Sequence, residues 1–149
     1  MRYHMRYRPA SAPSLAVTIV RVRMGRGPRM NASRRSGKTF SQITSDTAAS
    51  PVEYALGALA SCQVVVYRLY AHQLGIRFDE ISIDAEGDLD VQGLFGADQS
   101  VRPGFSAVRL NVNISGPETQ ERYEELRRTV DAHCPVLDLF ANPTPVSAE

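Results

Sequence analysis

The sequence predicts an α+β fold, and two observations carry that prediction. Residues 51–74 form a mostly apolar run behind a helix start signal, and strand-like segments with alternating apolar and polar residues lie on both sides of it. A second helical pattern follows near the end of the chain. Strands, a long helix, more strands and a helix in this order give an α+β class. The sequence has no internal repeat, and its 149 residues suit one domain.

The first residues carry no periodic apolar pattern. We therefore expect residues 1–13 to form a disordered tail and residues 14–149 to form a single domain. From Leu15 to Met24 apolar and polar residues alternate, which predicts a strand. The apolar phase shifts by one residue near Ile19, so we expect a bulge there or a strand whose second half is turned.

The segment between this strand and the long helix is less regular. Residues 25–28 contain Gly and Pro and favour a turn, residues 29–37 show only a weak pattern, and residues 38–44 are compatible with a strand. Together with the first strand they predict a small antiparallel sheet before the helix.

The long helix begins with the residues of a capping box. Ser50 can accept a hydrogen bond from the backbone N–H of Glu53, and the Glu53 carboxylate can accept one from the Ser50 amide. Pro51 suits the first helical position, and Gly75 is expected to end the helix because glycine tolerates a left-handed conformation. The helix has no clean polar face, and one domain of this size cannot surround it. We therefore expect a second subunit to complete its burial.

The second half of the chain contains two more strand patterns and a helix. The alternation is cleanest between residues 105 and 114, which predicts one buried and one solvated face. We expect a strand at 76–86, a surface loop or wide hairpin at 87–104, a strand at 105–114, a helix from a start signal at 115–118 to about His133, and a further short turn at 136–140.

Composition and charge narrow the class of protein. Hydrophobic residues make up 43% and charged residues 22%, which is typical of a globular domain. We expect no membrane association, because no apolar run is long enough for a membrane span, and a cytoplasmic location, because no hydrophobic signal segment is present. All sixteen acidic residues, but only seven of the seventeen basic ones, lie from Asp46 onward. The basic front lacks a helical or aromatic-interleaved reading element, so we expect no nucleic-acid partner.

The two cysteines, Cys62 and Cys134, suggest redox chemistry. A thiolate can attack a peroxide, and a second thiol can then condense with the sulfenic acid to form a disulfide. Cys62 lies too far along its helix to be activated by the helix N-terminus, so a nearby cation would have to lower its pKa. Cys134 lies at a helix C-terminus, which suits a resolving thiol better than an attacking one.

Two simpler interpretations of the cysteines stay open. Buried free cysteines usually behave as small hydrophobic residues, and a cysteine in an apolar helix is more often structural than reactive. A zinc site from Cys62, Cys134 and either His133 or His72 is less favoured, because the chain has no closely spaced pair of cysteines or histidines. We expect neither a metal nor an organic cofactor, and we assign the histidines no catalytic role.

Three segments resemble a known family. They are Ser50–Cys62 (SPVEYALGALASC), His133–Val136 (HCPV) and the closing run at 142–146 (NPTPV). Over residues 38–146 the chain resembles the OsmC/Ohr family of osmotically induced and organic-hydroperoxide-resistance proteins. The segment at 44–50 is shorter than the glycine-rich acidic loop of many members, which indicates a divergent OsmC-like protein.

The resemblance implies a fold and an activity. The fold would be an intertwined homodimer in which antiparallel sheets from both chains wrap two long central helices, with active sites at the dimer interface. The activity would be that of a thiol-dependent peroxidase that reduces organic hydroperoxides in defence against oxidative stress. A dithiol reductant, for example one of lipoyl type, would regenerate the enzyme. Leu59, Val65 and Val66 would line the site and favour hydrophobic hydroperoxides.

The resemblance also assigns site residues. Cys62 matches the peroxidatic cysteine, Cys134 the resolving one, and Glu53 the glutamate that holds the thiolate together with an arginine. Our choice for the arginine is Arg35, taken from a set without a distinguishing motif: Arg23, Arg26, Arg29, Arg34 and Arg35. Nine residues of straight helix separate Glu53 from Cys62 by about 13.5 Å and half a turn. Glu53 therefore either serves the site of a partner subunit or only caps its own helix.

Two other functions remain as alternatives to the peroxidase. The first is a non-catalytic binding or stress-adaptor protein that keeps the OsmC-like fold while its cysteines are structural. A cysteine pKa near the free value would favour that alternative. The second is a nucleic-acid binder that uses residues 1–37, for which affinity would fall steeply with salt.

Overall fold

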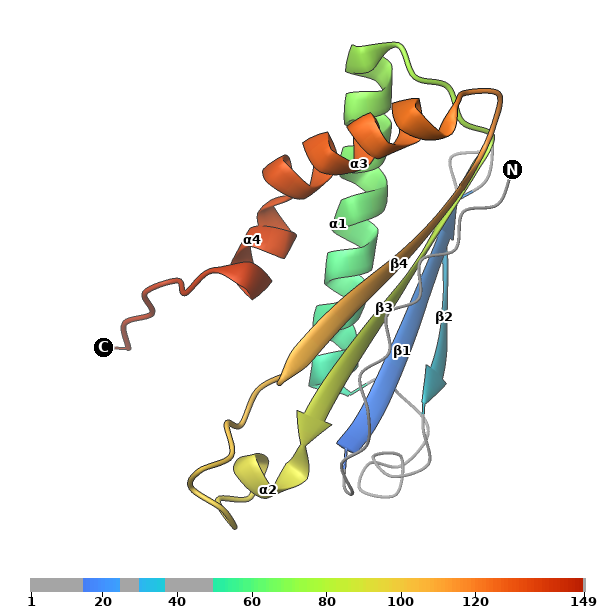
Figure 1. The fold of residues 1–149 in the computed structure, drawn as a ribbon. Coiled ribbons are helices and arrows are strands. Elements are labelled where there is room, and N and C mark those ends of the chain that lie inside the picture. Colours follow the sequence, from blue (N-terminus) through green and yellow to red (C-terminus); the bar gives the residue numbers. More distant parts are fainter. Residues whose placement is uncertain (1–14, 25–29, 37–49, 149) are drawn as a thin grey trace.

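The computed structural model describes residues 15–24, 30–36 and 50–148, which form an antiparallel sheet with helices packed against it (Figure 1). The sheet has four strands in the order β2-β1-β3-β4. The strands are β1 Leu15–Met24, β2 Met30–Ser36, β3 Glu80–Asp90 and β4 Ala107–Ser115, and the helices are α1 Pro51–Leu74, α2 Val91–Leu94, α3 Gln120–His133 and α4 Pro135–Ala141. The predicted α+β class is confirmed. Among these helices none is long and apolar enough to cross a membrane.

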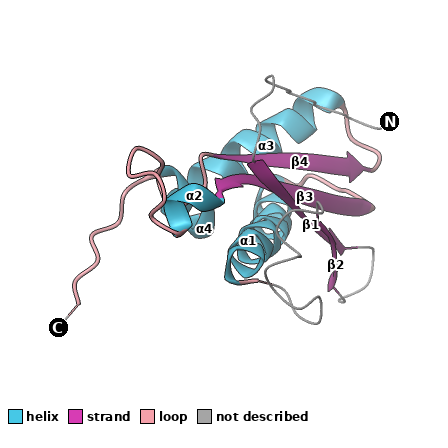
Figure 2. Ribbon diagram, turned by 90° about the horizontal axis from the view of Figure 1, so that it is seen from below, coloured by secondary structure: helices cyan, strands magenta, loops and turns pink. Residues whose placement is uncertain are grey.

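Helix α1 is the longest element and forms as the sequence predicts. Ser50 caps it: the Ser50 amide donates to Glu53 Oε2 at 2.7 Å, and the Glu53 amide donates to Ser50 Oγ at 3.4 Å. At the other end Gly75 adopts a left-handed conformation with φ of 64°. The helix lies across one face of β1 and β3, and Figure 2 shows it beneath these strands.

The predicted bulge in β1 is wrong. β1 pairs without interruption with both β2 and β3, and its register places Ile19 opposite Glu86 and Val20 opposite Ala85. Adjacent positions of a regular strand lie on opposite faces of the sheet. The shift in the apolar pattern therefore marks a straight strand that has apolar positions on one face in its first half and on the other face in its second half.

Strand β2 was not predicted from the sequence. Its segment, Met30–Ser36, is mostly polar and lacks alternation, yet it pairs antiparallel with β1 at the edge of the sheet. An edge strand needs less apolar alternation, because only one of its long edges is paired with a neighbour. The predicted tail at 1–13, turn at 25–28 and strand at 38–44 lie outside the described residues.

Two predicted boundaries in the second half are also wrong. β3 starts at Glu80 and continues through Gly87 to Asp90, where a loop was expected. Gly87 fits this strand because a Cβ there would lie 2.5 Å from the Phe105 ring. The start signal at 115–118 does not open α3, because Ser115 still pairs with Glu80 in the sheet; Thr119 caps the helix instead. α3 ends at His133 as predicted, and α4 extends the expected short turn.

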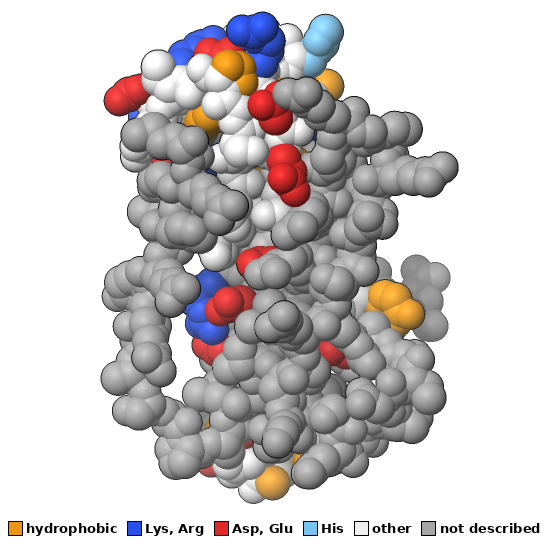
Figure 3. Space-filling model, turned by 90° about the vertical axis from the view of Figure 1, so that its right-hand side faces the viewer, with side chains coloured by type: hydrophobic (Ala, Val, Ile, Leu, Met, Phe, Trp, Pro, Cys, Tyr) orange, Lys and Arg blue, Asp and Glu red, His pale blue; other side chains and the backbone are white. Residues whose placement is uncertain are grey.

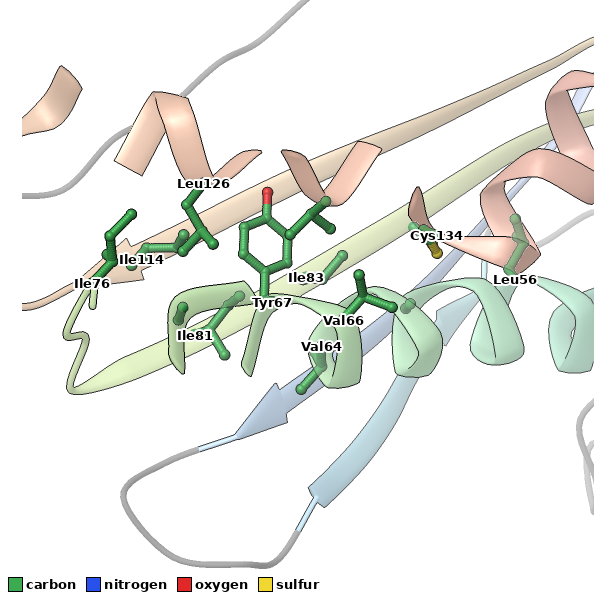
Figure 4. Packing of buried hydrophobic residues seen from close by; sticks show 14 residues of the cluster. Leu56, Val64, Val66, Tyr67, Ile76, Ile81, Ile83, Ile114, Leu126 and Cys134 are labelled. Carbon is green, nitrogen blue, oxygen red and sulfur yellow. The ribbon is translucent and has the colours of Figure 1, made fainter. Parts of the chain in front are cut away.

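The core lies where α1 meets the sheet and α3. Tyr67, Leu56, Ile81, Ile83 and Leu126 are fully buried there (Figure 4). A stripe of α1 is left exposed by the described residues, since Tyr54, Val65 and Leu69 are 65%, 54% and 51% exposed. The helix is thus buried against its own chain on one side and carries exposed apolar side chains on the other.

The α1–α3 contact should contribute strongly to stability. Replacing fully buried Leu126 by Ala should lower the free energy of unfolding by about 2–5 kcal/mol, because it removes apolar contacts and leaves a cavity. Leu94→Ala is the control, since Leu94 is 53% exposed and should change the free energy by less than about 1 kcal/mol. Urea denaturation followed by circular dichroism measures both, and equal effects would contradict this account of the core.

Candidate redox site

The structure brings the two cysteines together. Cys62 lies on α1 and Cys134 lies at the junction of α3 and α4, and their Sγ atoms are 3.5 Å apart although 72 residues separate them in sequence. Both are free thiols. A disulfide requires about 2.05 Å between the sulfurs, so a small movement of either side chain would allow a bond.

The path of α3 explains why the sulfurs meet. Arg122 Nη2 donates to the Leu74 carbonyl at 2.9 Å, and the Tyr123 hydroxyl donates to the Arg77 carbonyl at 2.9 Å, so the start of α3 is fixed to the end of α1. From there α3 crosses over α1 at a steep angle (Figure 1). Its end at His133 places Cys134 beside the middle of α1, where Cys62 lies.

Cys134 is held at a corner of the backbone. Cys134 is both the C-cap of α3 and the N-cap of α4, with φ of −81° and ψ of 111°. Pro135 is the first residue of α4. Proline suits a first helical position but cannot continue a preceding helix, which is why the chain turns here. The sequence HCPV thus fixes both the end of one helix and the place of the thiol.

The surroundings of the two thiols differ. Cys134 is 2% exposed, and this burial raises the pKa of its thiol; the neighbouring Cys62 raises it further, while the backbone of Leu137 lowers it. Cys62 is only half-buried. A cavity of about 380 Å³ opens beside Cys134 and is lined by residues of the α3–α4 corner. A thiol with a raised pKa is a poor attacking group. These surroundings therefore agree with the expectation that Cys62 attacks and Cys134 resolves.

Glu53 does not join the sulfur pair within one chain. It is 5% exposed and lies in the first turn of α1, where it forms the capping box with Ser50. Cys62 is nine residues further along the same helix. The structure therefore supports the capping role directly, and any role at a thiolate would have to be at a site of another subunit.

For Arg35 the structure gives the strand register. Arg35 belongs to the edge strand β2, and its register position falls opposite Ile19, whereas Arg34 falls opposite Val20. Val20 pairs with Ala85, which is buried in the core on the side of the sheet that α1 covers. Arg34 is thus placed on the α1 side and Arg35 on the other. Of the other candidates, Arg23 lies in β1, while Arg26 and Arg29 lie outside the described residues.

A buried polar group that directly follows Cys62 in sequence was not predicted. Gln63 follows Cys62 on α1 and is fully buried, and among the described residues its amide atoms have no hydrogen-bond partner. Asp131, three residues before Cys134, lies near it and is bound to Arg127 at 2.7 Å. Burial raises the pKa of Asp131 although Arg127 lowers it. A glutamine inside an otherwise apolar run was the sequence signal that could have identified this group.

His133 and His72 lie in separate surroundings. His133 Nδ1 lies 2.7 Å from the Thr129 carbonyl, and its ring is 5.0 Å from that of Tyr70. His72 is exposed in the last turn of α1. Within the part of the chain that the structure describes, no three His, Cys, Asp or Glu side chains are grouped so that they could hold a metal ion.

Comparison with known proteins identifies the family. The family described as OsmC-like protein matches residues 44–149. This chain belongs to the OsmC-like protein family. The predicted resemblance is therefore confirmed, although no curated protein matches the chain.

The fold of this OsmC-like protein also matches a solved structure. It is the crystal structure of an OsmC-like hydroperoxide resistance protein from Jannaschia sp. CCS1, with a TM-score of 0.63 over 89% of this chain and 91% of that chain. The sequences are only 11% identical, so the likeness shows a shared fold.

The raised pKa of Cys134 can be measured by alkylation. In the Cys62→Ser variant of this OsmC-like protein, the rate of reaction with iodoacetamide should rise with pH, with a midpoint above that of the same variant unfolded in urea. Burial is the largest cause of the shift and persists in this variant, and a raised pKa means less thiolate at any neutral pH. Poor access would lower the rate at every pH without moving the midpoint. A pH midpoint in the folded variant at or below the midpoint in urea would contradict the raised pKa of Cys134.

Proposed function

We propose that this OsmC-like protein is a thiol-dependent peroxidase that reduces organic hydroperoxides in defence against oxidative stress. The observation that carries the proposal is the 3.5 Å approach of Cys62 Sγ and Cys134 Sγ. Membership of the OsmC-like family supports it, as does the shared fold with a protein described as a hydroperoxide resistance protein. No step requires a metal or an organic cofactor.

The reaction has three steps that balance. The Cys62 thiolate attacks the terminal oxygen of the hydroperoxide, the O–O bond breaks, and the alkoxide takes a proton to leave as an alcohol. The resulting sulfenic acid condenses with the Cys134 thiol, which forms the disulfide and releases water. A dithiol reductant then returns both cysteines to thiols and is itself oxidised to a disulfide. The half-buried sulfur acts first and the buried one second.

The working form in this proposal is a cytoplasmic homodimer, in which residues 14–149 of each chain form one domain. The exposed apolar stripe of Tyr54, Val65 and Leu69 on α1 supports it, because a second copy of the helix would bury these side chains. A dimer would also allow Glu53 and Arg35 of one subunit to approach the Cys62 of the other. An opposite charge beside a thiolate stabilises it, and a carboxylate can hold the guanidinium in place.

Oxidation in solution tests the proposal. A small excess of cumene hydroperoxide added to the reduced protein, followed by alkylation and peptide mapping, should yield a Cys62–Cys134 disulfide peptide and one equivalent of alcohol. Cys62→Ser should abolish consumption of the peroxide, whereas Cys134→Ser should stop at a sulfenic acid that dimedone traps. Cumene hydroperoxide should react faster than hydrogen peroxide, because desolvating its apolar group is favourable. Two thiols that remain alkylatable would instead support a non-catalytic OsmC-like binding or stress-adaptor protein.

The supporting residues can be tested with matched controls. Arg35→Ala and Glu53→Gln should each slow oxidation of Cys62 roughly 10- to 100-fold, the loss expected for one charge-assisted hydrogen bond. Arg34→Ala removes the neighbouring guanidinium, and Ser50→Ala removes the other half of the capping box while keeping the carboxylate. These two controls should oxidise at nearly the rate of the unaltered protein in stopped-flow assays. If only Arg34→Ala slows the oxidation of Cys62, then Arg34 and not Arg35 is the arginine that stabilises the thiolate.

A further inference from the structure

A second and larger cavity adjoins the one beside Cys134 and shares Asp131, Leu137 and Ala141 with it. It has a volume of about 830 Å³ and is bounded by β4 on one side and by α3 and α4 on the other; we call it the β4 groove. Neither cysteine lines it. Its volume falls within the range of about 300–1,000 Å³ that is usual for small-molecule sites. The groove is therefore a candidate site in its own right.

The walls of the groove are mostly apolar. Strand β4 directs alternate residues into it, and these positions are half-buried except Ile114, which is buried. The apolar lining includes Phe105, Val108, Leu110, Val112, Leu137 and Phe140. The rings of Phe105 and Phe140 are 6.2 Å apart, from opposite walls. Such a lining favours an alkyl chain over a polar ligand.

One wall of the groove carries an unsatisfied hydroxyl. Tyr67 lines the groove from α1 and is fully buried, and among the described residues its hydroxyl has no hydrogen-bond partner. In Figure 4 its ring stands away from α1 with the hydroxyl directed toward α3. Burial and the nearby Asp131 raise the pKa of Tyr67, so the hydroxyl stays protonated and can donate. A buried donor without an acceptor is unfavourable unless a ligand supplies one.

The charges beside Tyr67 define which head group fits. Arg127 is the nearby cation, and its guanidinium already binds Glu124 at 2.6 Å and Asp131 at 2.7 Å. All three of these residues line the groove. Two carboxylates and one guanidinium leave this end of the groove with net negative charge. A carboxylate or phosphate head would be repelled here, whereas an uncharged hydroxyl or carbonyl oxygen could accept from Tyr67.

We propose that the β4 groove binds a long-chain amphiphile with an uncharged, hydrogen-bonding head, whose alkyl chain lies on β4 and whose head accepts from Tyr67. Neither cysteine lines this site, and binding there does not depend on the proposed peroxidase activity. The class includes long-chain alcohols and monoacyl compounds with a neutral head.

Binding can be measured on the full-length reduced protein. The neutral fluorophore N-phenylnaphthylamine should brighten on addition of the protein, and dodecanol below its solubility limit should displace it. Dodecanoate has the same chain length but an anionic head, and should displace the fluorophore at least about tenfold more weakly. Tyr67→Phe removes only the hydroxyl and should weaken dodecanol about fivefold, the value of one neutral hydrogen bond.

Variants of β4 localise the site. Val112→Glu places a charge in the groove, whereas Asn113→Glu places the same charge on the other face of the strand. Only the first should abolish the fluorescence gain, with circular dichroism confirming that both are folded. If Val112→Glu fails to fold, Val108→Trp provides the second variant, because it fills the groove with an apolar ring and should reduce binding. Light scattering of each variant gives its oligomeric state.

Three results would overturn the proposal. The first is a fluorophore that does not brighten or is not displaced by dodecanol. The second is dodecanoate that binds as tightly as dodecanol. The third is an unaltered protein that is dimeric and does not brighten the fluorophore, together with a Val112→Glu protein that is monomeric. The groove would then be filled by a second copy of the chain.

Discussion

The packing of α1 against α3 determines where the sulfurs lie. Leu126 and Val130 of α3 are fully buried, and Tyr67 of α1 is fully buried with them. Cys134 would not be positioned beside Cys62 without this contact, because it follows the last residue of α3 directly. The interaction has an apolar centre and polar contacts toward both ends: Arg122 donates to the Leu74 carbonyl at the start of α3, and Asp131 lies near Gln63 toward its end. The apolar part supplies the stability, and the polar part leaves amide and hydroxyl groups incompletely satisfied.

The described surface has a mixed charge. Figure 3 views the molecule from the side of the sheet edge and shows acidic and basic side chains next to one another at its upper end. On β4, Arg109 donates to both carboxylate oxygens of Asp88, at 2.6 and 2.7 Å, and this bonding lowers the pKa of Asp88. Arg77, Arg122 and Arg127 are likewise paired with carboxylates.

Local signals predicted some elements well and others poorly. The bounds of α1 followed from Ser50, Pro51 and Gly75, since caps act through adjacent backbone groups. β2 and the register of β1 could not be predicted, because strand pairing depends on partners far away in sequence. For the same reason the sequence could not choose between Arg34 and Arg35, which differ by one step of the pleat. The approach of the two sulfurs was expected only from the family resemblance, since a separation of 72 residues contains no geometric information.

The position of Cys134 at a helix corner has a consequence for folding energetics. A bond between the two sulfurs would close a loop of 72 residues in the unfolded chain, which in the chain-entropy treatment stabilises the folded state by about 4 kcal/mol. It would also tie the corner between α3 and α4 to the middle of α1. The oxidised protein would therefore resist heat and proteases better than the reduced one. A reductant that restores the thiols would have to overcome this difference, so its reducing strength would be matched to the stability of the fold as well as to the chemistry of the thiols.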